Sequence, residues 1–227
     1  MTDLVLARAR MVERQLKGRG ITDPRVLAAM ASVPREAFIA ESQRDAAYVD
    51  GPLPIGEGQT ISQPFVVAMM LQAAELQPDD RALEIGAGSG YAAAIMAEIV
   101  REVHTVERHP RLAEIARARL ELMKYRNVQV HLGDGSLGWP DAAPFDAIIT
   151  AAGGPVVPAT LKRQLAIGGR LVMPVGPGGE QCLLKLTRQS ETHFREEDLG
   201  AVWFVPLIGA EGWPTPSTTG AEPDPSG

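Results

Sequence analysis

The chain of 227 residues has very little cysteine and no long apolar run. Its single cysteine, Cys182, excludes an internal disulfide framework and is typical of a reducing compartment. No stretch approaches the roughly 20 apolar residues that a membrane-spanning helix needs. The start, MTDLVLARARMVERQL, has an early acid and helical spacing, which is not the pattern of a signal peptide. We therefore expect a cytoplasmic protein with no membrane partner.

The charge balance argues against a nucleic-acid-binding protein, and the histidines argue against a metalloprotein. The formal net charge is -6, and lysine and arginine are mixed with acids, so no basic stripe indicates a nucleic-acid partner. The four histidines lack the spacing of metal ligands, so we expect no metal site. They are His104, His109, His131 and His193. An apolar share of 45% and a charged share of 22% are typical of a globular protein. We also expect the protein to be a monomer.

The chain divides into a helical start, a sheet region and a tail. The first 45 residues have amphipathic helical spacing, and TDPRVLAAMASV begins with Thr22 or Asp23 as cap and Pro24 in the first turn. Residues 49–60, VDGPLPIGEGQT, are rich in glycine and proline and predict a loop. We predict one domain over 1–212, with the helical part and loop at 1–57 and the sheet at 58–212. Residues 213–227 hold four prolines and little to bury, which predicts a disordered tail.

Strands and helices alternate through the sheet region. Predicted strands are 81–85, 102–107, 128–132, 145–150, 170–175, 181–188 and 199–207. Predicted helices after the one that Pro64 opens are 91–100, 110–123 and 158–165, the last stopped by Gly168 and Gly169. Alternation predicts right-handed crossovers and helices on both faces, and two final strands without a helix predict an antiparallel finish. The fold class is α/β: a doubly wound, mainly parallel seven-stranded sheet with N-terminal helices.

A glycine loop follows the first predicted strand of the sheet. In LEIGAGSGY, Gly86, Gly88 and Gly90 are spaced G-x-G-x-G, not G-x-G-x-x-G as in dinucleotide sites. Glu84 stands at the loop entrance and no lysine or arginine is present, which favours a ligand with positive charge and no phosphate. S-adenosylmethionine, with a sulfonium and an ammonium, meets both conditions. The glycine triplet alone is equally typical of an ordinary strand-to-helix turn.

Two acids fall where an adenosine would need them. Glu107 ends the second strand of the sheet, at the offset of about 20 residues where an acid accepts ribose hydroxyls. Asp134 follows the next strand and is placed to accept from the adenine amino group, while Gly135 lets the ring approach the backbone. Each acid alone also suits a solvated strand end or a turn. Together at the ends of successive parallel strands, they favour an adenosyl cofactor.

Seven segments in order carry a family resemblance. GQTISQP, LEIGAGSGY, VER, GDG, APFDAII, GGRLVMPVG and VWFVPL resemble the protein-L-isoaspartate O-methyltransferases, from about residue 10 to about residue 212. The resemblance implies the class I S-adenosylmethionine-dependent, Rossmann-like fold. It also implies methyl transfer to the α-carboxylate of L-isoaspartyl residues in damaged proteins and peptides, whose ester then collapses to a succinimide. GQTISQP is more specific than the glycine loop, which all related methyltransferases share.

The resemblance also assigns site residues. It places Ser62 at the active site, Gln59, Thr60, Ile61 and Ser62 beside the cofactor, and Glu107, Asp134 and Gly135 on adenosine. A carboxylate acceptor has a pKa near about 3.3–3.7, so methyl transfer needs alignment and exclusion of water and no general base. A neutral serine hydroxyl can donate one hydrogen bond to that carboxylate. No Ser-His-Asp set surrounds Ser62, which argues against a covalent nucleophile.

Ser62 has a purely structural alternative as the cap of the helix that begins at Pro64. Because the residue before a proline is pushed out of the helical conformation, Gln63 is the better cap and Ser62 lies outside it. Thr60 either shares the acceptor carboxylate or braces the loop. Near the end, AVWFVPL predicts a strand whose edge, with Val205 and Pro206, pairs with an extended acceptor peptide. The alternative is a core strand with Trp203 or Phe204 packed inward.

One segment of the chain departs from the pattern of the family that it resembles. Relatives often have prolines after the fourth strand where this chain has Gly153 and Gly154, which bears on the rigidity of the acceptor side.

The nearest alternative function is a methyltransferase for a small molecule or a natural-product peptide. A nucleic-acid amino-methyltransferase lacks its proline-proline-aromatic segment here, and a nicotinamide dehydrogenase needs the longer glycine spacing. A cofactor-binding module without catalysis need not keep Ser62.

Overall fold

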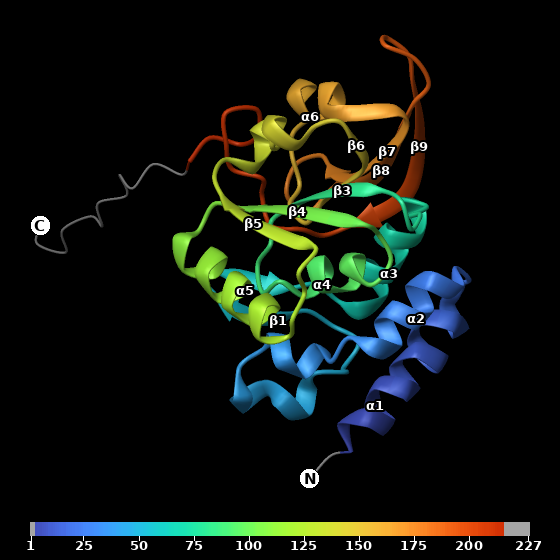
Figure 1. The fold of residues 1–227 in the computed structure, drawn as a ribbon, viewed down its shortest axis with the longest axis vertical. Coiled ribbons are helices and arrows are strands. Elements are labelled where there is room, and N and C mark those ends of the chain that lie inside the picture. The colour runs from blue at the N-terminus through green and yellow to red at the C-terminus, as the bar shows by residue number, and fades with distance from the viewer. Residues whose placement is uncertain (1–2, 216–227) are drawn as a thin grey trace, which may run out of the picture.

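The alternating pattern folds into a seven-stranded sheet in the computed structural model, which describes residues 3–215 (Figure 1). The strands of this sheet are β3 Arg81–Ile85, β4 Glu102–Glu107, β5 Val128–Leu132, β6 Phe145–Thr150, β7 Leu165–Val175, β8 Gln181–Arg188 and β9 Phe194–Val202. Their order is β5-β4-β3-β6-β7-β8-β9, parallel from β5 to β7 and antiparallel from β7 to β9. The predicted fold class is confirmed.

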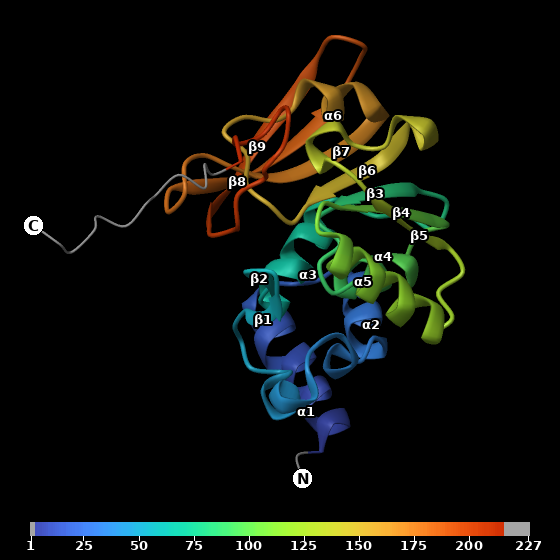
Figure 2. The same cartoon turned by 90° about the vertical axis from the view of Figure 1, so that its left-hand side faces the viewer.

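Alternate residues of the inner strands pack into two apolar clusters, one on each face of the sheet. The helices of the sheet region are α3 Pro64–Ala73, α4 Tyr91–Ala97, α5 Pro110–Leu122 and α6 Ala159–Gln164. Ala82 and Val103 join a cluster with α3 and α4, whereas Leu83 and Ile85 join one with Leu161 of α6. Figure 2 shows α6 on one face and α3, α4 and α5 on the other, with the N-terminal helices beyond them. Because helices cover both faces, the inner strands β3, β4 and β6 are buried over nearly their whole length.

The N-terminal part is helical, as predicted. Helix α1, Leu4–Arg10, continues through a π-helical turn at Met11–Leu16 to Arg19. Helix α2, Pro24–Ser32, is capped by Asp23, whose carboxylate accepts the backbone N–H groups of Arg25 and Val26. No helix within residues 3–215 has both the length and the apolar character that crossing a membrane demands.

Residues 49–60 are not a plain loop, which corrects the sequence prediction. They contain β1 Leu53–Gly56, which pairs antiparallel with β2 Gln59–Ile61. The turn residues Gly56, Glu57 and Gly58 all have positive φ, a conformation that glycine tolerates best. The hairpin brings the GQTISQP segment, which begins at Gly58, against the main sheet.

Other boundaries also differ from the prediction, and α4 ends at Ala97, three residues before the predicted end. Helix α6 ends at Gln164 and β7 begins at Leu165, so Gly168 and Gly169 lie inside a strand, where pairing with β6 is irregular. The last strand, β9, covers 194–202 and ends before Trp203, so Val205 and Pro206 lie outside it. Trp213, predicted to open a disordered tail, donates its backbone N–H to Leu207 O and its indole N–H to Gly153 O. Residues 216–227 of the predicted tail lie outside the described residues.

Candidate active site

Two adjoining cavities lie where the carboxyl ends of the parallel strands meet the β1–β2 hairpin. The order of the sheet reverses at β3, which has β4 on one side and β6 on the other. Such a switch point opens a crevice beyond the strand ends. We call the two cavities the strand-end cavity and the groove. The strand-end cavity is lined by Gln59, Thr60, Ile85, Gly86, Gly88, Val106, Glu107, Arg108, His109, Gly135, Ala151, Ala152, Val205, Pro206, Leu207 and Ile208.

Glu107 is the one acidic side chain that lines the strand-end cavity among the described residues. One carboxylate oxygen, Oε2, accepts the Gly88 N–H at 2.8 Å, and Oε1 accepts the His109 N–H at 2.9 Å. The side chain is 4% exposed, so these bonds hold it rigidly at the end of β4. Each oxygen keeps a lone pair for a further donor, which suits two neighbouring hydroxyl groups.

The glycine loop shapes the cavity floor through two different effects. Gly86 and Gly88 line the cavity, and both have positive φ. Gly90 does not line it; with φ near 89° it is the residue before α4, and a Cβ there would lie 3.4 Å from Ala116 Cβ of α5. Gly90 therefore allows α4 to pack closely on α5. Its position does not support the predicted direct contact with the cofactor.

Glu84 lies within the core, away from the cavity walls. It is 1% exposed, and the Thr105 hydroxyl donates to its carboxyl group at 2.5 Å. Burial, partly offset by the Thr105 bond, raises the pKa of Glu84 to about 8. The predicted direct contact of Glu84 with the cofactor is therefore not supported by this position. Ile61, also predicted to touch the cofactor, is likewise a core residue, 4% exposed.

Asp134 is engaged by the C-terminal strap, which we define as residues 203–213. Its Oδ1 accepts from both the backbone and the hydroxyl of Ser136, and its Oδ2 accepts the Ala210 N–H at 2.7 Å. Asp134 does not line the strand-end cavity, whereas its neighbour Gly135 does. A Cβ on Gly135 would lie 2.4 Å from Ile85 Cγ2, so this close approach requires glycine.

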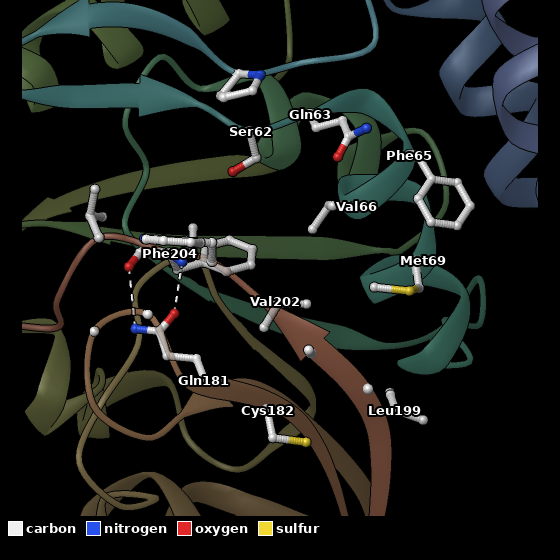
Figure 3. A pocket seen from close by; sticks show the side chains of 18 of the residues that line it. Ser62, Gln63, Phe65, Val66, Met69, Gln181, Cys182, Leu199, Val202 and Phe204 are labelled. Atoms are coloured by element: carbon white, nitrogen blue, oxygen red, sulfur yellow. Dashed lines mark hydrogen bonds between the residues drawn. The ribbon is translucent and has the colours of Figure 1, made fainter.

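The groove is the larger cavity, about 1170 Å³ in volume. That volume is more than a single carboxylate needs and is in the range of sites that hold drug-sized ligands or larger. Its walls are the start of α3, the end of β9, the 178–182 segment and the strap (Figure 3). Ser62 lies just before α3, and Figure 3 shows its hydroxyl turned toward Phe204 across the groove. No hydrogen bond within residues 3–215 engages that hydroxyl.

Gln63, not Ser62, occupies the cap position of α3, as predicted. Its side chain makes no capping bond, so the helix start relies on Pro64 and leaves Ser62 outside the helix. The Ser62 carbonyl accepts from Nη1 of Arg35 at 2.8 Å. Arg35 also donates to the carbonyls of Ala47 and Gly51 and is fully buried. This single guanidinium fixes the backbone that carries the Ser62 hydroxyl.

The strap is held against the sheet by backbone pairing at Gly153. The Gly153 N–H donates to Val205 O, and the Leu207 N–H donates to Gly153 O, each at 2.8 Å. The Gln181 side chain bonds both backbone groups of Phe204, as Figure 3 shows. A Cβ on Gly153 would lie 2.3 Å from Gln181 Nε2, so glycine here permits close packing of the strap. Gly153 and Gly154 therefore do not make this side loose.

Thr60, Ala151, Val205 and Pro206 line both cavities. The groove and the strand-end cavity therefore meet at this point, beside Ser62. All four predicted acceptor residues, Thr60, Ser62, Val205 and Pro206, line the groove. Of the predicted cofactor residues, Gln59, Thr60, Gly86, Gly88, Glu107 and Gly135 line the strand-end cavity.

Some lining residues were missed by sequence reasoning. Ala151 and Ala152 directly follow β6, and their position after a buried strand was a signal that could have found them. Met69 and Leu199, on opposite walls of the groove, belong to elements 130 residues apart in the sequence, and no local pattern joins them.

Of the two aromatic residues predicted as alternatives for inward packing, Trp203 and Phe204, one is buried and the other is exposed. Phe204 is 9% exposed and packs inward, whereas Trp203 is 81% exposed at the rim of the groove. The described residues hold no group of three or more histidine, cysteine or acidic side chains arranged for a metal ion.

The model of the protein-L-isoaspartate(D-aspartate) O-methyltransferase family matches residues 7–212. A protein-L-isoaspartate O-methyltransferase of Rhodopseudomonas palustris is 59% identical over 211 residues, covering 92% of this chain and 97% of the relative. One of Protochlamydia amoebophila is 55% identical over 210 residues, covering 92% and 100%.

Solved structures agree with the sequence comparisons. A protein-L-isoaspartate O-methyltransferase structure superposes with a TM-score of 0.81 at 29% identity, covering 90% of this chain and 67% of the other. A putative enzyme of the same kind from Plasmodium falciparum, in complex with S-adenosyl-L-homocysteine, superposes with a TM-score of 0.77 at 28% identity, covering 88% and 98%.

Proposed function

This chain belongs to the protein-L-isoaspartate(D-aspartate) O-methyltransferase family, and from that premise we propose how its two cavities divide the reaction. The activity is transfer of a methyl group from S-adenosylmethionine to the α-carboxylate of L-isoaspartyl residues in damaged proteins and peptides. The strand-end cavity holds the cofactor, and the groove holds the isoaspartyl segment. Ser62 aligns the acceptor carboxylate where the two cavities meet.

The residues of the strand-end cavity fit an adenosyl cofactor. Glu107 is a buried carboxylate with lone pairs left for the two ribose hydroxyls, and no lysine or arginine of the glycine loop awaits a phosphate. Gly135 packs so closely on Ile85 that a larger residue would clash there, and both residues form part of the cavity wall. When bound, S-adenosylmethionine supplies an activated methyl group on a sulfonium. Gln59, Thr60 and the glycine loop would hold its methionine end.

Alignment is the task left to the protein. The acceptor carboxylate is ionised at pH 7, so no side chain has to remove a proton. The free Ser62 hydroxyl donates one hydrogen bond to it and, being neutral, leaves its negative charge available. Arg35 holds the Ser62 backbone, and the strap closes the junction from the other side. Val205 and Pro206 line both cavities at this junction, where a bound peptide and cofactor would shield the reacting atoms from water.

One observation carries this proposal: Thr60, Ala151, Val205 and Pro206 line both cavities. A methyl group in one cavity and a carboxylate in the other can meet only where the two cavities adjoin, and these four residues mark that place. Asp134 then acts through the strap, which it fixes through Ala210, and any bond to adenine uses the lone pairs that remain on its carboxylate.

The experiment uses methyl-labelled S-adenosylmethionine with matched isoaspartyl and aspartyl peptides. We expect base-labile label on the isoaspartyl peptide and none on the aspartyl peptide. Equal labelling of both peptides, or none on either, would remove the proposal. Label transferred only to a small carboxylic acid would instead support the small-molecule alternative.

The acceptor backbone has a docking edge at β9, the outer strand of the described sheet. Its last residues, 199–202, line the groove, and the outer backbone groups other than the Gly200 N–H, which Asp198 accepts, would pair with an extended peptide. This moves the predicted pairing edge from Val205 and Pro206 to the strand before them. The monomeric state and the cytoplasmic location stay predictions.

A further inference from the structure

The end of β9 carries an irregularity that shapes the groove. Cys182 pairs with Ala201 and Leu184 pairs with Asp198, so Leu199 and Gly200 together oppose the single residue Leu183. This is a β-bulge, an extra residue inserted in one strand, and Gly200 within it has a positive φ of 102°. The Asp198 carboxylate accepts the Gly200 N–H at 2.7 Å and the Cys182 thiol at 2.6 Å, which holds the bulge in place.

The bulge puts two apolar side chains on one face. In a regular strand, residues three apart point to opposite faces of the sheet. Here Leu199 and Val202 are three apart, yet both pack against the cluster that contains α3. The inserted residue therefore adds a second apolar side chain to the wall of the groove. Bulges beside functional sites often re-aim a side chain in this way.

An apolar wall faces them from α3. Val66 and Met69 also line the groove and are only partly buried, and Figure 3 shows them opposite Leu199 and Val202. The apolar stretch therefore lies in the same groove as Ser62.

We propose that these four residues, Val66, Met69, Leu199 and Val202, form a bulge subsite for a large apolar side chain of the acceptor peptide. The inference rests on the proposed function, because the groove is continuous with Ser62 and the occupant is the peptide that carries the isoaspartyl residue. Met69 lies six residues along α3 from Gln63, about 9 Å at 1.5 Å per residue. An extended peptide covers that span in about two or three residues. The subsite therefore selects a leucine-sized side chain two or three positions from the isoaspartyl residue.

The test is a peptide scan. Isoaspartyl peptides of glycine and serine carry a single leucine, or a matched serine, at each of three positions on either side. We expect leucine at one position, two or three residues away on one side, to lower KM about tenfold. In Leu199→Ser and in Met69→Ser this gain should fall below about twofold, with the affinity for S-adenosylhomocysteine unchanged. Leu122→Ser, at an exposed leucine on α5, is the control and should keep the full gain.

Each outcome separates the subsite from the activity. Isoaspartyl peptides methylated with the same KM wherever leucine stands, or a gain that survives both groove variants, would overturn the subsite and leave the proposed function intact. No methylation of any isoaspartyl peptide would instead remove the proposed function. A concentration-dependent dimer that Leu199→Ser dissociates would assign the apolar wall to a second copy of the chain, which also overturns the proposal. Unchanged binding of S-adenosylhomocysteine shows that each variant is folded.

Discussion

The strand-end cavity and the groove differ in how far their parts lie from one another in the sequence. The strand-end cavity is built mainly from the residues that directly follow β3, β4, β5 and β6. The groove joins the N-terminal part, the start of α3, the end of β9 and the strap. The cofactor side is therefore mainly a product of regular parallel strands, which the hairpin and the strap complete, whereas the acceptor side depends chiefly on irregular features: the hairpin, a bulge and the strap.

The largest effect should come from breaking the cofactor side alone. Glu107→Ala removes the carboxylate that we assign to the ribose and frees the Gly88 and His109 N–H groups. Because bonds to a charged group contribute about 1.5–3 kcal/mol each, we expect the dissociation constant of S-adenosylhomocysteine to rise at least about 100-fold. Isothermal titration calorimetry measures it.

The control for this change lies on the same strand. Glu102, at the other end of β4, bonds Arg81 and His104, so Glu102→Ala should leave the affinity within about twofold. Similar losses in the two variants would mean that the strand, and not the carboxylate at its end, is responsible.

The acceptor side should break at Ser62 without disturbing the cofactor. Ser62→Ala removes one hydrogen bond to the acceptor carboxylate, so we expect kcat to fall about 10- to 100-fold with the S-adenosylhomocysteine affinity unchanged. Steady-state kinetics with an isoaspartyl peptide gives kcat, and Ser190→Ala in the β8–β9 turn is the control. A large loss of cofactor affinity at unchanged kcat would contradict the role given to Ser62.

Arg35 sharpens the comparison because it acts on the groove through Ser62. Arg35→Lys should loosen the Ser62 backbone and lower kcat about three- to tenfold, and in a Ser62→Ala background the further loss should stay below about twofold. Arg170 is a matched control: it donates to the carbonyls of Ala74 and Glu75 at the other end of α3. Arg170→Lys should lower the unfolding temperature and leave kcat unchanged. Additive losses for Arg35→Lys and Ser62→Ala would make Arg35 only structural.

The smallest effect concerns stability and not catalysis. The pKa of Glu84 is raised to about 8, so the folded state keeps a proton that the unfolded state releases above its usual pKa near 4.5. The free energy of unfolding should therefore fall as the pH rises through this window. Glu84→Gln should remove about 2 kcal/mol or more of the difference between pH 5 and pH 8. Urea titrations at pH 5 and pH 8 measure the free energy of unfolding. An unchanged difference in the variant would mean that Glu84 is not the group that causes the pH dependence.

Much of the cofactor side could be predicted from the sequence because its signals are local. The short segments that alternate with the predicted helices matched β3 to β6 residue for residue, and Glu107 was predicted from its position at a strand end. Glu84 and Asp134 show where local signals stop. Whether a carboxylate at a strand end faces a cavity depends on its partners, Thr105 for one and Ala210 of the strap for the other.

The acceptor side was less predictable because its features arise from pairing between distant segments. A bulge is a mismatch between two strands, and nothing within FREEDLGAV alone shows that Leu199 and Val202 share a face. The sequence predicts a strand over 199–207, yet residues 203–207 lie outside β9 and Pro206 pairs with Gly153 through an isolated bridge. Ser62 was found because the whole GQTISQP segment resembles a family, not through its chemistry.

The pH dependence of a single turnover tests most directly that orientation takes the place of proton removal. With saturating cofactor and isoaspartyl peptide, the rate of methyl transfer between pH 6 and pH 8.5 should vary by less than about twofold, because the acceptor carboxylate is ionised throughout. A rate that climbs about tenfold per pH unit toward a midpoint near neutrality would show that a protein group must first lose its proton, and would contradict that claim.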